Sequence, residues 1–97
     1  MADLILSVRA RQDLMDIGNY TIKKWSEQQA EQYIRMIISE CSNLASHPLS
    51  GRSYGQWRPG LRGYPCGKHV IFYRIPSPGK IRIVRILHEK MDFPRHL

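Results

Sequence analysis

The spacing of hydrophobic residues changes near residue 48, from a helical period before it to a strand period after it. Over residues 11–47, apolar side chains recur every three or four positions, as in helices that bury one face. Over residues 61–87, short runs alternate apolar and polar side chains, as in half-buried strands. This order predicts an α+β fold with the helices first and most of the sheet last.

The first half predicts one strand and two helices. Residues 4–10, "LILSVRA", are rich in Leu, Ile and Val and predict a short strand, and residues 11–25 predict a helix that ends in lysines. "SEQQ" at 26–29 matches a capping box, with Ser26 as the N-cap and Gln29 reaching back, so a second helix begins there and ends before Pro48. With almost no linker, the helices should form an antiparallel hairpin. Their predicted buried faces are Leu14, Ile17, Gly18, Thr21 and Trp25 in the first helix, and Ala30, Tyr33, Ile34, Ile37, Ile38, Cys41, Leu44 and Ala45 in the second.

The second half predicts a long loop and three strands. Residues 48–60 are rich in Pro and Gly, and such a loop is either functional or a surface loop with Trp57 packed on the core. Strands follow at 61–66, 69–75 and 81–87, with "PSPGK" as the last turn. The result is a single domain, residues 1–97, of β-α-α-β-β-β order. Its helical hairpin packs on a small, mostly antiparallel sheet, in which residues 61–97 supply a basic three-stranded part and a C-terminal tail.

The last two strands allow a prediction of which side chains share a face. If residues 76–80 form the loop, Ile75 lies opposite Ile81 and Arg74 opposite Arg82, and strand alternation then assigns the other positions. The more apolar set should face the helices, and the other set should form an open, positively charged face. A single bulge would shift this register. The set toward the helices is His69, Ile71, Tyr73, Ile75, Ile81, Ile83, Arg85 and Leu87, and the open set is Val70, Phe72, Arg74, Arg82, Val84, Ile86 and His88.

Positive charge is concentrated in the second half of the chain. The net charge is +7, yet residues 1–47 hold five Lys/Arg against six Asp/Glu, whereas residues 48–97 hold ten against two, Glu89 and Asp92. Seven of the ten are arginines, so most have no acidic partner in their own half. They are either solvated on an exposed sheet face or paired with anions of a partner: nucleic acid, anionic lipid or an acidic protein segment.

Other features narrow the class of protein. Cys41 and Cys66 are isolated, which argues against a disulfide framework or a zinc site and fits a reducing cytoplasm. The four histidines are too scattered for a metal site, and the glycines of the loop do not form a phosphate-binding pattern. No apolar run approaches the roughly 20 residues of a membrane span. We therefore expect a cytoplasmic protein with no membrane segment, metal or cofactor.

Several short motifs, in a specific order, cover essentially the whole chain. They are "DL.DI..YT...W", "QA..Y", "LA..P..G", "PGLR", "HVIFYR" and "I.IVRILHEKMD...HL". In this order and spacing they resemble the ParE toxins of bacterial toxin–antitoxin pairs, within the RelE/ParE superfamily. The resemblance implies a small toxin that binds DNA gyrase, through its A subunit, and blocks replication. It also implies a ParD-like antitoxin with a ribbon-helix-helix N-terminal part and an acidic C-terminal segment, so that DNA is contacted only indirectly.

The candidate binding residues follow from the charges and from this resemblance. An acidic antitoxin segment or the target would supply the carboxylates that the arginines lack. Arg85 is a separate case, because its position toward the helices predicts an ion pair with a carboxylate of the first half. The binding candidates are Arg62, Arg74, Arg82, Arg85, His88, Met91 and Asp92, with Arg52, Trp57 and Arg58 in the loop.

An enzymatic alternative remains open. RelE-type relatives cut messenger RNA on the ribosome, which requires a base, an acid and cations that stabilise the phosphorane. His88 at a strand end would be the catalytic group, and Arg62, Arg74 and Arg82 would hold phosphate. The nearest second group, His69, falls on the other face in the predicted register, so no acid–base pair is obvious, although Lys68 and Tyr64 remain candidates. We therefore expect no catalytic residues and favour a toxin that acts by binding.

Overall fold

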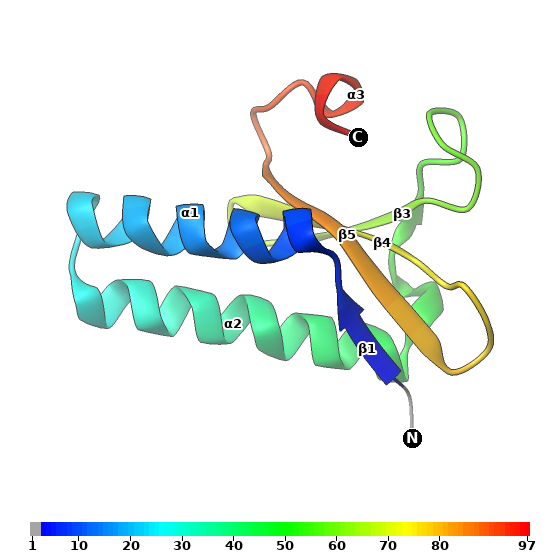
Figure 1. Ribbon diagram of the computed structural model, residues 1–97, viewed down its shortest axis with the longest axis horizontal. Helices are drawn as coiled ribbons and strands as arrows, with labels where there is room; N and C mark the ends of the chain where they lie inside the picture. The colour runs from blue at the N-terminus through cyan, green and yellow to red at the C-terminus, as the bar shows by residue number, and fades with distance from the viewer. Residues whose placement is uncertain (1–2) are drawn as a thin grey trace.

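The computed structural model describes residues 3–97 and shows a helical hairpin beside a curved five-stranded sheet (Figure 1). Core side chains from both helices and from one face of the sheet form a single cluster. The α+β class and the hairpin are as predicted. The elements are β1 (Asp3–Leu6), α1 (Val8–Lys24), α2 (Glu27–Ser46), a 3₁₀ turn η1 (Pro48–Ser50), β2 (Arg52–Ser53), β3 (Arg62–Cys66), β4 (His69–Arg74), β5 (Lys80–His88) and α3 (Phe93–His96).

The sheet has the strand order β1-β5-β4-β3-β2. β1 runs parallel to β5, and the other three pairings are antiparallel, which confirms the mostly antiparallel prediction. β2 was not predicted, because two residues inside a Gly- and Pro-rich loop give no alternation to detect. The basic strands predicted for residues 61–97 are therefore the middle of a wider sheet.

The first strand is shorter than predicted, because Ser7 begins a helix. Its Oγ accepts a hydrogen bond from the Ala10 N–H at 3.0 Å, and α1 starts at Val8. N-capping of this kind overrides the strand propensity of the residues around it. Ala10 is consequently a fully buried helix residue and not the end of a strand. The second predicted cap is confirmed, since the Ser26 Oγ accepts from the Gln29 N–H at 3.1 Å, and α2 ends at Ser46, before Pro48.

Two residues assigned to the buried helix faces are exposed instead. Trp25 is 65% exposed because it lies in the turn between α1 and α2, at the tip of the hairpin that projects beyond the sheet (Figure 1). Ile38 is 46% exposed because it lies at the margin of the α2 stripe. The rest of the stripe is buried or half-buried. The main core cluster is Ala10, Ile17, Ile37, Cys41, Leu44, Cys66, Ile71, Tyr73, Ile81, Ile83 and Ile86.

A β-bulge in β5 divides the predicted register into a correct part and an incorrect part. Arg74 pairs with Arg82 and Tyr73 with Ile83 as predicted, but Phe72 pairs with Arg85, so that Val84 is an extra residue. Every later position is shifted by one. Ile86 therefore belongs to the core on the helix side, and Arg85 and Leu87 lie on the opposite face, beside Phe72 and Val70, the reverse of the prediction. His88 at the end of β5 is shifted in the same way, because it pairs with His69 and therefore shares its face of the sheet.

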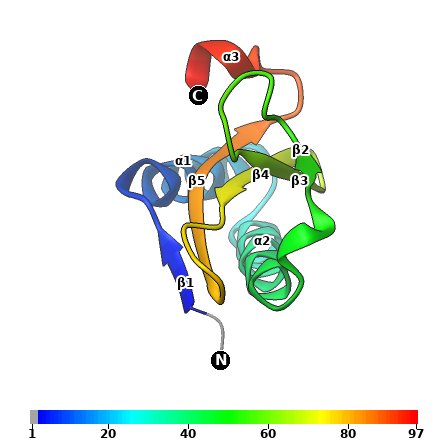
Figure 2. The same cartoon turned by 90° about the vertical axis from the view of Figure 1, so that its right-hand side faces the viewer.

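The sheet face away from the helices is partly covered and not open. Leu61, Val70, Phe72 and Leu87 form a second buried cluster there, and α3 and the loop before β3 pack on it. Figure 2 shows these two segments lying side by side over this face. Their contact is aromatic: the Tyr54, Trp57 and Phe93 rings meet each other, and Tyr54 and Phe93 also meet Phe72. The loop alternative in which Trp57 packs on the protein is therefore confirmed, although its side chain is still 40% exposed.

Candidate functional site

Four arginines share the sheet face away from the helices, and we call them the arginine face: Arg52, Arg58, Arg74 and Arg82. Arg74 and Arg82 are direct cross-strand neighbours near the β4–β5 turn. Arg52 lies in register with Gly63, which in turn pairs with Phe72 of the second cluster. Arg58 reaches α3, which covers the same face. The predicted opposition of Arg74 and Arg82 is thus present in the fold.

Three of these arginines are oriented by contacts within the fold. The Arg74 Nη1 donates to the Pro59 carbonyl, the Arg58 Nη2 donates to the main-chain oxygen of Leu97, and the Arg52 guanidinium lies over the Tyr54 ring, 5.2 Å from its centroid. The Pro59 carbonyl and the Tyr54 ring carry no net charge. Among residues 3–97, the side-chain ion pairs are Arg35–Glu31 and Arg85–Asp13. Arg52, Arg74 and Arg82 therefore keep their positive charge, in spite of the cost of placing like charges opposite each other.

Arg62 does not belong to this face. It pairs with Tyr73, which points to the helices, and its Nη1 donates to the Gly51 carbonyl at 2.6 Å. The Tyr73 hydroxyl completes the arrangement, because it accepts from the Gly51 N–H at 2.9 Å and donates to the Pro48 carbonyl at 2.6 Å. Arg62 thus anchors the start of the loop. The sequence grouped Arg62 with Arg74 and Arg82, because β3 has too few apolar residues to show which of its side chains face the helices.

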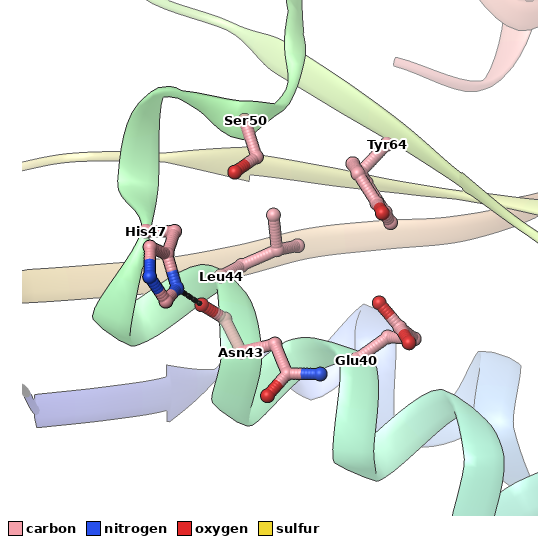
Figure 3. A pocket seen from close by; sticks show the side chains of 6 residues that line it. All are labelled: Glu40, Asn43, Leu44, His47, Ser50 and Tyr64. Atoms are coloured by element: carbon pink, nitrogen blue, oxygen red, sulfur yellow. Dashed lines mark hydrogen bonds between the residues drawn. The ribbon is translucent and has the colours of Figure 1, made fainter.

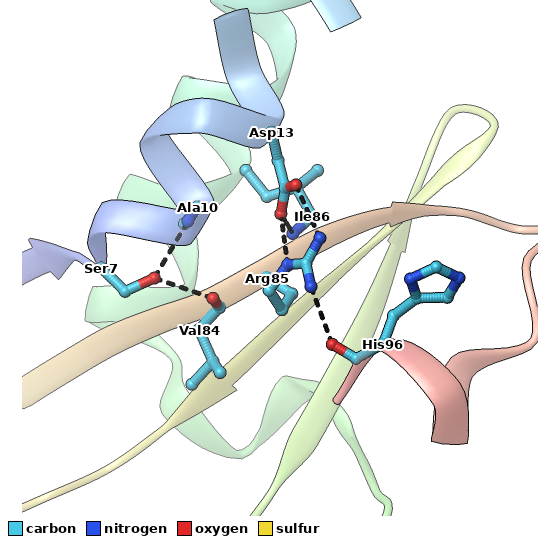
Figure 4. Close-up of polar contacts among 7 residues, drawn as sticks. All are labelled: Ser7, Ala10, Asp13, Val84, Arg85, Ile86 and His96. Atoms are coloured by element: carbon cyan, nitrogen blue, oxygen red, sulfur yellow. Dashed lines mark hydrogen bonds and ion pairs between the residues drawn. The ribbon is translucent and has the colours of Figure 1, made fainter. Parts of the chain in front are cut away.

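Arg85 forms the predicted ion pair with a first-half carboxylate, that of Asp13 (Figure 4). The Arg85 Nε and Nη2 donate to the two Asp13 oxygens at 2.8 and 2.9 Å, and Nη1 donates to the His96 carbonyl at 2.8 Å. Both side chains are largely buried. The bond from Asp13 raises the pKa of Arg85, against the burial that lowers it. Arg85 is therefore engaged within the fold.

Asp13 and Ser7 also close an edge of the sheet (Figure 4). β1 pairs with β5 only as far as Ile83, so the outer edge of β5 has no strand beside it from Val84 onward. There the Ser7 Oγ donates to the Val84 carbonyl at 2.8 Å, and the Asp13 Oδ2 accepts from the Ile86 N–H at 2.9 Å. Side chains of α1 thus replace a missing strand. Sequence reasoning did not find either residue, because both look like ordinary polar positions of a helix start.

The bulge brings His88 and His69 together, whereas the predicted register placed them on opposite faces. Their ring centroids are 5.2 Å apart, with the rings nearly perpendicular. The Tyr33 hydroxyl, which accepts from the Lys68 N–H at 3.0 Å, lies 2.6 Å from the His69 Nδ1, and burial raises the pKa of Tyr33. Burial lowers the pKa of His69 and keeps its ring neutral, so one of its two nitrogens is free to accept a hydrogen bond. His88 Nδ1 accepts from the Lys90 N–H at 3.1 Å.

The stability of the fold should fall in mild acid because of His69. Burial, and next the neighbouring His88, lower the pKa of His69 from 6.5 to about 4, while Glu89 and Asp13 oppose this weakly. Below about pH 6.5 the unfolded chain binds a proton that the folded chain refuses, so stability is complete above pH 6.5 and is lost as the pH falls toward 4. Since this imidazole is only half-buried, we expect a loss of about 1–2 kcal/mol. Urea titrations at pH 7 and pH 4.5 should show it, and His69→Gln should abolish more of the slope than His47→Gln, a change at an exposed histidine. Equal slopes in all three proteins would contradict this assignment.

The histidine pair and the arginines do not form one catalytic centre. His88 is six residues from Arg82 along β5, or about 20 Å at the rise of an extended strand. The histidines also lie on the helix side of the sheet, and Arg74 and Arg82 on the other side. The structure therefore does not bring His88 together with Arg74 and Arg82, as the enzymatic alternative requires.

The two remaining predicted binding residues, Met91 and Asp92, differ in their exposure to solvent. Met91 is half-buried against the second cluster, and Asp92 is exposed just before α3. A polar hollow of about 330 Å³ lies elsewhere, between the end of α2 and β3 (Figure 3). It contains no member of the arginine face. Its lining residues are Glu40, Asn43, Leu44, His47, Ser50 and Tyr64.

The described residues were also considered for metal ligands, reactive thiols and membrane-spanning helices. Residues 3–97 contain no group of three His, Cys, Asp or Glu side chains that could hold a metal ion. Cys41 and Cys66 are free, buried thiols, and burial raises the pKa of Cys41 to about 12. In the part of the chain that the structure describes, no helix has the length and apolar character required to cross a membrane. The candidate site is therefore the arginine face, a surface suited to binding an acidic partner.

A small α+β fold with a basic surface that its own acidic side chains do not neutralise indicates a protein that acts by binding. Comparison with known proteins identifies the family. The family model described as "ParE toxin of type II toxin-antitoxin system, parDE" matches residues 4–93. Toxin ParE1 of Mycobacterium tuberculosis is 39% identical over 93 residues, covering 96% of this chain and 95% of that protein, and Toxin ParE1 of Caulobacter vibrioides is 37% identical over 92 residues, covering 95% and 94%. A solved structure described as "Chromosomal ParDE TA system from P. aeruginosa" superposes with a TM-score of 0.77 at 22% identity, covering 91% of this chain and 96% of that one. The chain belongs to the ParE toxin family of type II toxin–antitoxin systems.

Proposed function

We propose that this ParE-family toxin acts in the cytoplasm by binding DNA gyrase through its A subunit, so that replication stops, and that a ParD-like antitoxin neutralises it. The observation that carries the proposal is the arginine face, in which Arg52, Arg74 and Arg82 meet no Asp or Glu side chain of residues 3–97 and the Pro59 carbonyl orients Arg74. Such a surface is prepared for the carboxylates of another protein. The ParE1 relatives and the similarity to a ParDE system of P. aeruginosa support a ParD-type partner.

The charge of the arginine face suits an acidic antitoxin segment. A disordered acidic chain is attracted over long range by a basic surface, which raises its association rate, and it becomes ordered only on binding. The exposed Arg82 can reach such a chain, and the half-buried Arg74 beside it is held in place by Pro59. The same two guanidiniums would serve contact with gyrase when the antitoxin is absent. One surface would then account for both toxicity and its neutralisation.

Binding and not catalysis is the proposed mode of action. His88, one of the two histidines that could exchange protons, is about 20 Å from Arg82, since the two residues are six positions apart along β5. A binding toxin needs neither group at a reacting atom. The arrangement of these side chains therefore favours binding over cleavage of messenger RNA on the ribosome.

The decisive experiment is a gyrase assay with a catalytic control. The purified protein should inhibit supercoiling by gyrase or trap cleaved DNA, and His88→Gln should do so within about twofold of the wild type, because the contacts of His88, with the Lys90 N–H and the His69 ring, lie away from the arginine face. A nuclease that used His88 as its base would instead lose roughly 10²–10⁴ in rate. Toxicity should be scored in parallel as growth inhibition per amount of soluble protein.

Two outcomes would count against the proposal. If gyrase activity is unchanged while messenger RNA is cleaved in translating ribosomes, the mode of action is wrong. If a well-folded His88→Gln protein no longer stops growth, binding alone does not explain the toxicity. A thermal melt of each variant excludes simple unfolding as the cause.

A further inference from the structure

A hollow at the end of α2 holds an acidic side chain that forms no ion pair within residues 3–97. The volume of the hollow is about 330 Å³, and residues of α2, η1 and β3 line it on the helix side of the sheet, opposite the arginine face. Figure 3 shows the Leu44 side chain in its middle, with His47 to one side. On the other side, the Glu40 carboxylate points toward Tyr64. We call this site the α2 hollow, and its lining residues are Glu40, Asn43, Leu44, His47, Ser50 and Tyr64.

The α2 hollow is locally negative, although the whole chain carries a net charge of +7. Glu40 is half-buried and takes part in neither of the ion pairs that residues 3–97 form. Burial raises the pKa of Cys66, and the negative charge of Glu40 is the next cause, so this charge acts as far as β3. In addition, α2 has no basic residue in its last turn, and the partial negative charge of its C-terminal carbonyls adds to that of Glu40. The hollow is therefore suited to a cation and not to an anion.

The shape of the α2 hollow favours a cation carried on an alkyl stem. Methylene groups can lie over Leu44 while a charged head reaches the carboxylate of Glu40, as the stems of Lys and Arg lie on apolar surface. The half-buried Tyr64 adds an aromatic ring beside that carboxylate, over which a guanidinium can lie. Among the lining residues, the hydrogen bond that is present joins the His47 Nδ1 to the Asn43 carbonyl, at 3.4 Å. The side-chain oxygens of Asn43 and Ser50 are thus available as further acceptors.

We propose that the α2 hollow binds one guanidinium or ammonium group on an alkyl stem, with the charge at Glu40 and the methylene groups over Leu44. Such a group can belong to a free alkylamine or alkylguanidine, or to an arginine or lysine side chain of a polypeptide. Arg62, on the same face of β3 as Tyr64, does not fill the hollow, because its Nη1 donates to the Gly51 carbonyl at 2.6 Å. This site takes a charge opposite to that taken by the arginine face, and it does not depend on the proposed action on gyrase.

A titration with two cationic probes tests the site and distinguishes the two sources of the cation. The probes are agmatine, a free alkylguanidine, and acetyl-Ala-Arg-Ala-amide, which carries a guanidinium as a side chain. The tighter of the two should bind the full-length protein at pH 8 with a Kd of about 0.1–1 mM, as expected for about ten non-hydrogen atoms in contact. It should also shift the amide NMR signals of Asn43, Ser50 and Tyr64. Tighter binding of agmatine identifies a free ligand, and tighter binding of the peptide identifies a polypeptide side chain.

Two matched controls make the site falsifiable. Glu40→Gln should weaken binding of the tighter probe by about tenfold, because a charge-assisted hydrogen bond is lost. Glu31→Gln makes the same change of net charge at an exposed acid of α2 and should have less than about a twofold effect. A citrulline peptide, nearly the same shape as the arginine peptide but uncharged, should bind the wild type at least about tenfold more weakly than the arginine peptide does.

Three results would overturn the cation site. They are no binding of either probe by the wild type, equal losses in the Glu40 and Glu31 variants, and equal binding of the arginine and citrulline peptides. The citrulline comparison uses the wild-type protein, so it holds even if a variant is poorly folded. A protein that inhibits gyrase but binds neither probe contradicts this inference alone.

Discussion

Replacing Asp13 with alanine is expected to lower the free energy of unfolding by about 3–5 kcal/mol, because it leaves a buried guanidinium without its counter-charge. The side chain of Arg85 would lose two hydrogen bonds, of 2.8 and 2.9 Å, and the Ile86 N–H at the strand edge would lose its acceptor. Urea denaturation monitored by far-UV circular dichroism would measure the change. The effect should be larger than that of any single change on the arginine face.

A neighbouring aspartate on the same helix provides the control. Asp16→Ala removes an exposed carboxylate that accepts one bond from Gln12 at 2.9 Å, and it should change stability by less than about 0.5 kcal/mol. Arg85→Met, which removes the charge and keeps much of the volume, should cost less in the Asp13→Ala background than in the wild type. If Asp13→Ala and Asp16→Ala have similar small effects, the ion pair does not hold α1 to β5.

Reversing the charge of Arg82 is expected to lower the association rate of an acidic antitoxin by about 10- to 100-fold at low salt, with a smaller loss at physiological salt. Arg82 is exposed and its neighbour Arg74 has no carboxylate partner within residues 3–97, so Arg82→Glu also creates an internal ion pair that consumes the second cation. Stopped-flow or surface-based kinetics at two salt concentrations would measure this. Folding should remain intact, since relief of like-charge opposition favours the fold.

The matched control changes the same amount of charge at a distance from the arginine face. Arg35 on α2 is exposed, and its ion pair with Glu31 is an exposed pair one helical turn apart, worth little. Arg35→Glu gives the same net charge as Arg82→Glu. If both variants slow association equally, total charge steers the partner, and the arginine face has no special role.

The sequence predicted the parts of the fold that local patterns determine. The Ser26 cap, the end of α2 before Pro48 and the opposition of Arg74 and Arg82 each depend on a few adjacent residues and a short turn. The Arg85 ion pair was also predicted, because a buried cation needs a carboxylate. The predicted face of Arg85 was wrong, since Arg85 pairs with Phe72 on the side away from the helices and meets Asp13 at the edge of β5 that has no neighbouring strand. Its partner could not be chosen among the first-half acids, since that choice depends on how α1 lies beside the edge of β5.

The parts that were wrong depend on long-range packing. Apolar residues stand in adjacent pairs on both sides of Arg85, Ile83–Val84 and Ile86–Leu87, so either face could be the apolar one and the sequence cannot show that Val84 is the extra residue. The open face was expected because nothing local indicates that Phe93 and Leu97 fold back over Phe72.

The bulge at Val84 separates strand length from side-chain direction at the end of β5. An unbroken β5 of the same length would place His88 opposite Lys68 and turn its ring away from Tyr33, toward the aromatic rings under α3. An unbroken β5 that lacks Val84 would instead keep the histidine opposite His69, on the face that it occupies now. When relatives are aligned, a one-residue gap at position 84 is therefore compatible with the same histidine pair.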